Sequence, residues 1–287
     1  MVEIKTPGEI DAIHAAGQVV ARILAAVRAT AAPGTRLSEL DEAARSVLSD
    51  ARATSPFLGY QPMWARSPFP AVVCVSVNDA ALHGIPGRRR LSGGDLVSVD
   101  VGAVLDGWAA DAAISFTIGP PRAGDARLIE AAGDALRAGI ATAVPGARIG
   151  DISAAVSAAG RAAGAGICSD FGGHGVGRAM HEDPHVPNDG RAGRGLRLLP
   201  GLVIAVEPWF LAGGQDSYRI DRDGWTVRSA DGSRAAHVEH TIAVTDDGPR
   251  ILTTPLPRLP VAARSGGRVD CDRPAATSGV PDSYSNA

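Results

Sequence analysis

The chain has 287 residues, of which 45% are hydrophobic and 21% charged, as is usual for a globular protein with a sizeable core. Its formal net charge of −3 excludes a general attraction to nucleic acid or to an anionic membrane, and no unbroken apolar run approaches the roughly 20 residues that cross a bilayer. Three scattered cysteines exclude a disulfide framework, so we expect a cytoplasmic location.

Two helices are predicted at the start of the chain. Thr6 can cap a helix that begins at Pro7, and Glu9 completes a capping box. Apolar residues then recur at helical spacing to about residue 30. Residues 33–37 break this helix, and residues 38–41 (Ser-Glu-Leu-Asp) have the form of a second helix start.

The same break recurs in the second half of the chain. Residues 128–144 form a predicted helix, and residues 145–149 (Pro-Gly-Ala-Arg-Ile) repeat the pattern of residues 33–37 (Pro-Gly-Thr-Arg-Leu) before a further helix. An offset of roughly 110 residues is too long for a solenoid repeat. One degenerate repeat can arise by chance, but the pattern favours an internal duplication, with two α+β halves packed about a pseudo-twofold axis.

Five segments have the composition of β-strands and are bounded by Gly, Pro, Asn or Asp. They are residues 71–77, 96–104, 108–118, 202–207 and 236–244. Beyond residue 257 the periodicity is lost, and Arg, Gly, Ser, Pro and Asp dominate. We therefore expect a single domain over residues 1–257 and a disordered tail over residues 258–287, which contains Cys271.

Two aspartates flank a predicted hairpin. Residues 106–107 (Asp-Gly) are a strong two-residue turn signal, and pairing outward from them sets Asp100 opposite Ala113 and Asp111 opposite Gly102. The two aspartates are then diagonal neighbours on one face of the sheet. They could face solvent, but their neighbours are apolar on both faces. Burial of two close carboxylates favours a metal ion between them.

Two histidines accompany acidic residues and glycines further along. His174 lies in the glycine-rich segment 171–177, where the backbone can approach a bound group closely. His181 begins the sequence His-Glu-Asp-Pro, whose proline excludes an HExxH zinc helix. A lone histidine is more often structural, but the two together favour a role in ligand binding.

Two glutamates complete a set of metal-binding residue types. Glu207 ends an apolar strand before a proline, and Glu239 lies in a predicted strand on the same face as His237 and Thr241. Two aspartates, two glutamates and a histidine suit hard or borderline ions such as Mn, Co, Fe or Zn. The set could hold two such ions side by side.

Five motifs, in order, resemble those of the methionine aminopeptidases. They are residues 74–86 (Cys-Val-Ser-Val-Asn-Asp-Ala-Ala-Leu-His-Gly-Ile-Pro), 98–102 (Ser-Val-Asp-Val-Gly), 173–184 (Gly-His-Gly-Val-Gly-Arg-Ala-Met-His-Glu-Asp-Pro), 206–208 (Val-Glu-Pro) and 238–241 (Val-Glu-His-Thr). The order and spacing match from about residue 3 to about residue 255. Only about 25 residues separate His181 from Glu207, so the chain resembles the type I enzymes of this M24 metallopeptidase family.

The resemblance implies the pita-bread fold, an α+β fold with two pseudo-twofold-related α/β halves around a central antiparallel sheet. It implies two divalent metal ions (Co, Mn, Fe or Zn) and hydrolysis by a metal-activated hydroxide. The implied metal ligands are Asp100, Asp111, His174, Glu207 and Glu239. In this scheme Asp111 and Glu239 bridge the two ions, and Asp100 chelates one of them.

The resemblance also implies roles in catalysis and substrate binding. His83 holds the scissile amide, His181 stabilises charge on the carbonyl oxygen, and Glu207 moves the proton. The substrate-binding residues are Tyr60, Phe69, Cys74, His83, Met180, His181 and Trp225. Residues 61–68 are longer than expected at the pocket rim, Met180 replaces a frequent aromatic residue, and His237 is expected to tune the metal preference.

The implied activity is removal of the initiator methionine from nascent proteins and peptides with a small second residue. We expect a monomer that contacts the ribosome transiently and binds neither nucleic acid nor membrane directly. An X-Pro aminopeptidase or prolidase would use the same five ligands, but it carries an N-terminal domain that we do not expect here. A metal-free binding protein of this fold would lose ligands and gain basic patches, whereas this chain has all five ligands.

Overall fold

The order of helices and strands repeats along residues 2–254, which a computed structural model of the protein describes. The helices in this part of the chain are α1 (Pro7–Thr30), α2 (Leu37–Ala51), α3 (Asp125–Ala141) and α4 (Ile149–Ala162). The strands are β1 (Cys74–Val77), β2 (Ala80–Leu82), β3 (Leu96–Leu105), β4 (Trp108–Thr117), β5 (Gly173–Gly175), β6 (Glu182–Val186), β7 (Val203–Val206), β8 (Trp209–Leu211), β9 (Tyr218–Ile220), β10 (Val227–Ser229), β11 (Ala235–His237), β12 (Glu239–Thr245) and β13 (Gly248–Ile251). The expected domain boundary at residue 257 and the expected tail with Cys271 lie outside the described residues.

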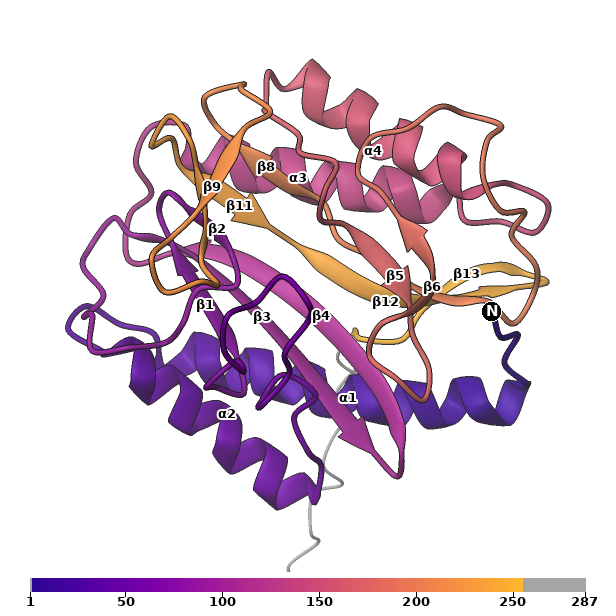
Figure 1. The fold of residues 1–287 in the computed structure, drawn as a ribbon, viewed down its shortest axis with the longest axis horizontal. Coiled ribbons are helices and arrows are strands. Elements are labelled where there is room, and N and C mark those ends of the chain that lie inside the picture. The colour runs from indigo at the N-terminus through magenta and orange to yellow at the C-terminus, as the bar shows by residue number, and fades with distance from the viewer. Residues whose placement is uncertain (1, 255–287) are drawn as a thin grey trace, which may run out of the picture. The chain divides into compact units, whose positions relative to one another are not determined.

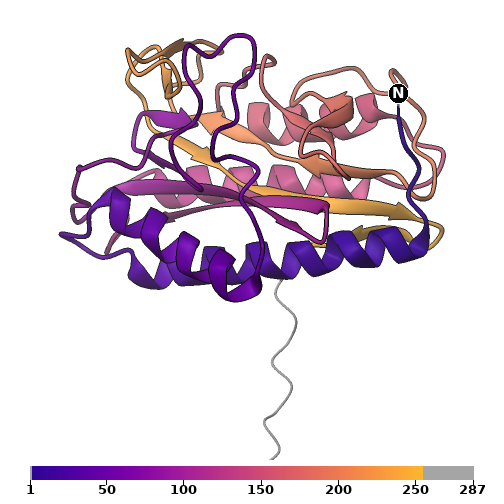
Figure 2. The same ribbon diagram turned by 60° about the horizontal axis from the view of Figure 1, so that its bottom comes forward.

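Eight strands form one antiparallel sheet in the order β1-β3-β4-β12-β7-β5-β6, with β13 paired to β12 (Figure 1). The strands of the two halves meet where β4 pairs with β12. Helix α1 packs on β3 and β4, while α3 packs on α4 and contacts β11 and β12. Figure 2 shows α1 and α2 running beneath the strands of the first half. The expected pita-bread architecture is confirmed.

Helix α1 begins and packs as its sequence predicts. The Glu9 N–H donates to the Thr6 hydroxyl, and the Thr6 N–H donates to the Glu9 carboxylate at 2.8 Å, which completes the capping box. One apolar face, with Ile13, Val20 and Ile23, is fully buried. By length and composition alone α1 could cross a bilayer, but its apolar residues join the core cluster that also contains residues of β3 and β4.

Two other helices begin earlier than the sequence predicts. Helix α2 begins at Leu37, so Ser38 lies inside the helix and does not cap it. Helix α3 spans Asp125–Ala141 in place of residues 128–144. Asp125 gives the reason: its carboxylate accepts a hydrogen bond from the N–H of residue 122 at 3.1 Å and forms an ion pair with Arg234 at 2.6 Å. These contacts hold the start of α3 in place three residues before its apolar face begins.

The two Pro-Gly-x-Arg breaks have the same backbone arrangement. Gly34 and Gly146 both adopt a positive φ, of 92° and 88°. Each glycine N–H donates to a leucine carbonyl, at 2.8 and 2.9 Å, from residues 91 and 198. Two residues further on, Arg36 and Arg148 each form an isolated antiparallel bridge, with residues 90 and 197. This equivalence supports the internal duplication inferred from the sequence.

The prediction of a single strand over residues 236–244 is wrong, because this segment forms two strands. Strand β11 pairs with β8 in a small two-stranded sheet, whereas β12 pairs with β4 and β7 in the central sheet. Between them the N–H of Val238 donates to the Pro208 carbonyl at 3.1 Å, outside both ladders. His237 and Glu239 therefore belong to different sheets.

Gly17, in the middle of α1, allows the helix to lie close to Leu252, the residue after β13, whose N–H donates to Thr241 of β12. A Cβ atom at Gly17 would lie 2.2 Å from the carbonyl oxygen of Leu252, whereas a Cβ atom at Gly8 would meet nothing within 4 Å. We predict that Gly17→Ala lowers the free energy of unfolding by about 1–3 kcal/mol, because the backbone must shift. Gly8→Ala, in the same helix, should leave it unchanged or raise it by up to about 1 kcal/mol.

Urea unfolding of both variants beside the parent protein measures this difference. Equal stability of the two variants would contradict the close approach of α1 to the sheet.

Candidate metal centre

Strands β3 and β4 form the hairpin that the sequence predicts. Asp106 and Gly107 have φ values of 51° and 78°, as a two-residue turn of this type requires. The register sets Asp100 opposite Ala113 and Asp111 opposite residue 102, so the predicted pairing is confirmed. The two aspartates thus lie on one face of the hairpin, in adjacent strands.

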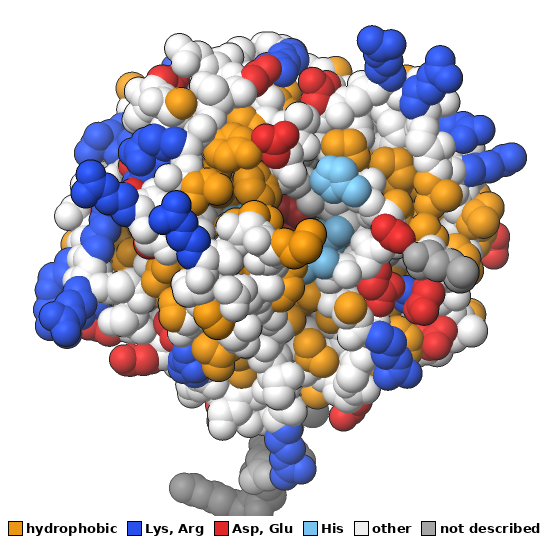
Figure 3. Space-filling view, viewed as in Figure 1, with side chains coloured by type: hydrophobic (Ala, Val, Ile, Leu, Met, Phe, Trp, Pro, Cys, Tyr) orange, Lys and Arg blue, Asp and Glu red, His pale blue; other side chains and the backbone are white. Residues whose placement is uncertain are grey.

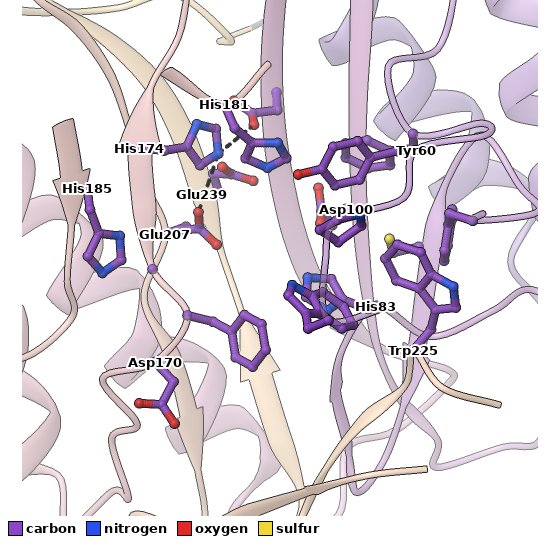
Figure 4. Close-up of a pocket in the computed structure, with 18 residues that line it drawn as sticks. Tyr60, His83, Asp100, Asp170, His174, His181, His185, Glu207, Trp225 and Glu239 are labelled. Atoms are coloured by element: carbon purple, nitrogen blue, oxygen red, sulfur yellow. Dashed lines mark ion pairs between the residues drawn. The ribbon is translucent and has the colours of Figure 1, made fainter. Parts of the chain in front are cut away.

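Three strands of the second half bring further ligand types to the same face. Glu239 is the first residue of β12 and pairs with Ala113 of β4. Glu207 directly follows β7, and His174 is the middle residue of β5. Figure 4 shows the side chains of His174, Glu207 and Glu239 directed toward one another, with Asp100 facing them from β3. Both halves of the fold therefore contribute to one cluster.

The distances within this cluster suit shared coordination. His174 Nε2 lies 3.3 Å from Asp111 Oδ2 and 3.6 Å from Glu207 Oε1. Asp111, His174 and Glu239 each offer a ligand atom within 4.8 Å of the others, and all three are buried. Asp100 stands outside this closest group but lines the same cavity. The five residues expected as metal ligands are thus brought together.

Burial makes this concentration of carboxylates costly in the absence of a cation. Burial, with the nearby charges, raises the pKa of Asp100 to about 7. Burial also raises the pKa of Glu239 well above its usual value, and Asp111, Glu207 and Asp100 add to the effect. Burial opposes ionisation of Asp111 as well, but His174, Thr241 and His181 together outweigh it and lower the Asp111 pKa. A divalent ion would relieve the remaining repulsion, so the donor set fits a metal centre.

Neighbouring groups orient the ligands. His174 Nδ1 lies 3.0 Å from the Gly175 carbonyl oxygen, which can only accept, so Nδ1 carries a proton and Nε2 is the nitrogen that faces the acidic residues. Burial opposes protonation of this ring, but Asp111 and Glu207 raise the pKa of His174 to about 9, so Nε2 carries a proton as well and would release it to bind a metal ion. Thr241 Oγ1 lies 2.7 Å from Asp111 Oδ1 and accepts a hydrogen bond from the Asp111 N–H at 3.0 Å. Such partners fix the rotamers of metal ligands and raise metal affinity.

His237 lies beside Glu207, although it comes from a different sheet. Its Nε2 atom is 3.5 Å from Glu207 Oε2, and the residue is only 2% exposed. Among the described residues this buried Nε2 atom has no hydrogen-bond partner of normal geometry. Through this contact His237 can act on Glu207, one of the expected metal ligands, and its effect on metal preference stays a prediction.

A cavity of about 340 Å³ opens onto the cluster. Figure 3 shows a hollow on this face in which histidine side chains lie beside hydrophobic ones. All but one of the expected substrate-binding residues line the cavity, namely Tyr60, Phe69, Cys74, His83, His181 and Trp225. Phe69, Cys74 and Trp225 belong to one buried apolar cluster, which gives the cavity a hydrophobic wall.

Met180 is the exception, because it does not line the cavity. Its side chain is buried in the core cluster of the first half. A Cβ atom at Gly102 would lie 2.5 Å from Met180 Cε, so the methionine fills the space that Gly102 leaves on β3. Met180 therefore packs in the core, in place of the contact with substrate that its motif implies.

Several cavity residues were missed by the sequence analysis. They are Phe57, Pro62, Trp64, Asp170, Phe171, Gly172 and His185. Phe171 and Gly172 are the first two residues of the glycine-rich segment 171–177, so their position in that motif could have revealed them. Pro62 and Trp64 lie in segment 61–68, which the family resemblance places at the pocket rim, but no pattern in the sequence singles out either residue.

The two expected catalytic histidines approach the cluster from different sides. The ring of His181 lies 4.4 Å from that of His174 and 5.1 Å from that of Tyr60, between centroids. The ring of His83 lies among Trp64, Phe171 and Trp225. Burial lowers the pKa of His83 to about 4, so its imidazole is neutral at neutral pH.

Comparison with known sequences agrees with this geometry. Residues 11–246 match the sequence model of metallopeptidase family M24. The chain is 50% identical over 260 residues to methionine aminopeptidase 1 of Mycobacterium tuberculosis, with 88% of this chain and 95% of that protein covered. It is 40% identical over 255 residues to the methionine aminopeptidase of Aquifex aeolicus, with 88% and 98% covered.

Comparison with solved structures also finds methionine aminopeptidases. The methionine aminopeptidase of Thermotoga maritima superposes with a TM-score of 0.84 at 37% identity, covering 88% of this chain and all of that one. The prolidase of Pyrococcus horikoshii superposes with a TM-score of 0.67 at 22% identity, covering 89% of this chain and 65% of that one. The second likeness shows only that the two share a fold.

The repulsion among the buried carboxylates predicts that a divalent cation stabilises the protein. Addition of Mn²⁺ or Co²⁺ at about 100 times its dissociation constant to metal-stripped protein should stabilise it by about 2.7 kcal/mol, which corresponds to a rise of about 5–10 °C in Tm. Asp111→Asn should lose most of this rise, because it removes a central ligand.

Asp170→Asn is the matched control, since Asp170 is an exposed acid that lines the same cavity outside the ligand cluster. Differential scanning calorimetry with and without metal measures each shift. Equal shifts in the parent protein and Asp111→Asn would show that the cation binds elsewhere.

Proposed function

The chain belongs to metallopeptidase family M24, and from that premise we propose that it is a type I methionine aminopeptidase. It removes the initiator methionine from nascent proteins and from peptides whose second residue is small. The observation that carries this proposal is the position of a hydrophobic wall, with Phe69, Cys74 and Trp225, beside the cluster of acidic residues and His174 in one cavity. Such a cavity can hold an apolar side chain while its polar end binds the reacting groups.

Asp100, Asp111, His174, Glu207 and Glu239 would hold two divalent metal ions. When bound, such ions lower the pKa of water and polarise a carbonyl group. Co, Mn, Fe and Zn all suit a set of four carboxylates and one imidazole. The orientation of His174 Nε2 and of Asp111, described above, supports this assignment.

Glu207 is the group that moves the proton. Burial opposes its ionisation, but His237 and His174 outweigh burial and lower the pKa of Glu207, so the carboxylate is ionised and able to accept a proton. Asn188 donates a hydrogen bond of 3.1 Å to the Glu207 backbone carbonyl, which fixes the end of β7. Glu207 takes a proton from the attacking water and delivers it to the leaving amine.

His83 and His181 contact the peptide bond that is cleaved. The neutral imidazole of His83 can donate or accept one hydrogen bond and so holds the scissile amide. His181, close to His174, stabilises the negative charge that develops on the carbonyl oxygen. Both residues hold the substrate between the cluster and the hydrophobic wall.

The hydrophobic wall binds the methionine side chain. Cys74 is buried and pairs with Asp100 in the register of β1 and β3, so it lies close to the cluster. Burial raises the pKa of the Cys74 thiol well above its usual value, so the sulfur stays uncharged. A neutral, polarizable sulfur beside Phe69 and Trp225 suits a thioether. Tyr60, whose ring lies 5.1 Å from that of His181, also lines the cavity.

The enzyme acts in the cytoplasm as a monomer and contacts the ribosome transiently as nascent chains emerge. Cys74 and Cys168 are both buried and unpaired, which suits a reducing compartment. The net charge of −3 agrees with the absence of direct nucleic-acid or membrane binding.

The proposed activity is tested with the peptide Met-Ala-Ser and metal-stripped protein refilled with Mn, Co, Fe or Zn. We predict release of free methionine with at least one of these metals and none without metal. Met-Pro-Ser and Leu-Ala-Ser are the comparison peptides, and Leu-Ala-Ser should be cleaved at least about tenfold more slowly, since the cavity is shaped for methionine. Cleavage of Met-Pro-Ser alone would indicate an X-Pro aminopeptidase instead.

Glu207→Gln should lower kcat by about 10²–10⁴, because a glutamine cannot carry the proton. Metal content, measured on the same preparation, separates loss of the proton carrier from loss of a ligand. His185→Gln serves as the control, since His185 lines the cavity but has no role in this scheme. Full activity of Glu207→Gln would remove Glu207 from its proposed role.

A further inference from the structure

Residues 61–68 form a loop whose two ends are fastened together. The N–H of Phe69 donates to the Tyr60 carbonyl at 2.8 Å, and the N–H of Gly59 donates to the Phe69 carbonyl at 2.9 Å. Inside the loop the N–H of Ala65 donates to the Pro62 carbonyl at 3.0 Å. The indole N–H of Trp225 donates to the backbone carbonyl of residue 67 at 2.9 Å. The loop is therefore held against the cavity wall by an indole that lines it.

One side chain of this loop enters the cavity and another does not. Trp64 lines the cavity and is 43% exposed, whereas Met63 is fully exposed to solvent and does not line it. The indole of Trp64 stacks on the ring of His83, with 5.8 Å between centroids and 24° between planes. Trp64 thus covers one side of the histidine that holds the scissile amide in the proposed function.

Trp64 also joins the two sides of the cavity. Its ring meets Trp225 edge-on at 5.0 Å, on the hydrophobic wall, and Phe171 edge-on at 5.9 Å, next to Asp170. Figure 4 shows Trp225 and Asp170 toward opposite edges of the cavity, with His83 between them. The indole of Trp64 therefore borders the path that a peptide would follow from the hydrophobic wall, past His83, to Phe171.

A peptide bound as in the proposed function places its second residue between His83, Phe171 and Trp64. Its methionine side chain lies against Phe69, Cys74 and Trp225, and its scissile bond lies at the acidic cluster beside His83. The next side chain must then occupy the space between His83, Phe171 and the indole of Trp64. An aromatic wall held by three ring contacts leaves little room for a large side chain there.

We propose that Trp64, carried by the loop of residues 61–68, determines how large the second residue of the substrate can be. The inference rests on the proposed function and adds to it a residue that limits substrate choice. The indole of Trp64 contacts the second side chain of the substrate and leaves no room for a large one. Its stacking on His83 keeps the imidazole ring in place.

The test compares Met-Ala-Ser with Met-Leu-Ser in the metal-loaded parent protein, Trp64→Ala, Trp64→Phe and Met63→Ala. The quantity measured is the ratio of kcat/KM for the alanine peptide to kcat/KM for the leucine peptide. Both peptides are assayed on the same preparation, so any unfolded fraction cancels from the ratio. Met63→Ala is the matched control, because Met63 lies in the same loop but points into solvent.

In Trp64→Ala the ratio should fall by about tenfold or more, because the leucine side chain gains room, and in Trp64→Phe it should fall by less. Met63→Ala should keep the parent ratio. An unchanged ratio in both Trp64 variants would overturn the inference. The inference would also be overturned if the variants changed only the ratio of kcat/KM for Met-Ala-Ser to kcat/KM for Leu-Ala-Ser, because these two peptides differ in their first residue. If Trp64→Ala has no turnover, an unchanged ratio in Trp64→Phe overturns it.

The parent protein separates this inference from the proposed function. A parent protein that cleaves neither methionine peptide with any of the four metals overturns the proposed function. An active parent with unaltered ratios in the variants overturns only the role of Trp64.

Discussion

Four carboxylates face one another at the centre of the sheet, and their mutual repulsion is the constraint around which the molecule is built. Asp100 and Asp111 come from the hairpin of the first half, and Glu207 and Glu239 come from strands of the second half. Burial makes each ionised form costly, and the single imidazole of His174 cannot neutralise them all. A divalent cation would satisfy both halves at once. The ion proposed to supply the chemistry would then also strengthen the junction between β4 and β12.

Much of this arrangement could be predicted because local chemistry decides it. A two-residue Asp-Gly turn allows only one register, so the positions of Asp100 and Asp111 followed from the distance of each to the turn. The capping box at Thr6 likewise depends only on residues within one helical turn. The Pro-Gly-x-Arg repeat could be recognised because Gly34 and Gly146 need the same positive φ and reach the same hydrogen bonds. The order of the family motifs then predicted that His174, Glu207 and Glu239 lie with the two aspartates.

The features that escaped prediction depend on contacts between distant segments. The strand over residues 236–244 looks continuous in its alternation, but the N–H of Val238 turns to the Pro208 carbonyl and divides it between two sheets. Met180 has the sequence position of a substrate contact, yet the missing side chain of Gly102 gives it a better place in the core. Trp64 lies in a loop without periodicity, and only the folded chain places its indole beside His83. In each case a partner far along the chain outweighs the local pattern.

The closure of the loop at Tyr60 and Phe69 has a consequence for how such an enzyme can diversify. Because the two ends meet through backbone hydrogen bonds, the number of residues between them can change without moving the strands that carry the ligands. Insertions and deletions there alter the rim while the metal-binding residues keep their register. With Trp64 in its proposed role, the limit on the second residue is encoded in a different stretch of the gene from the acidic cluster, so evolution can revise this limit without altering the cluster.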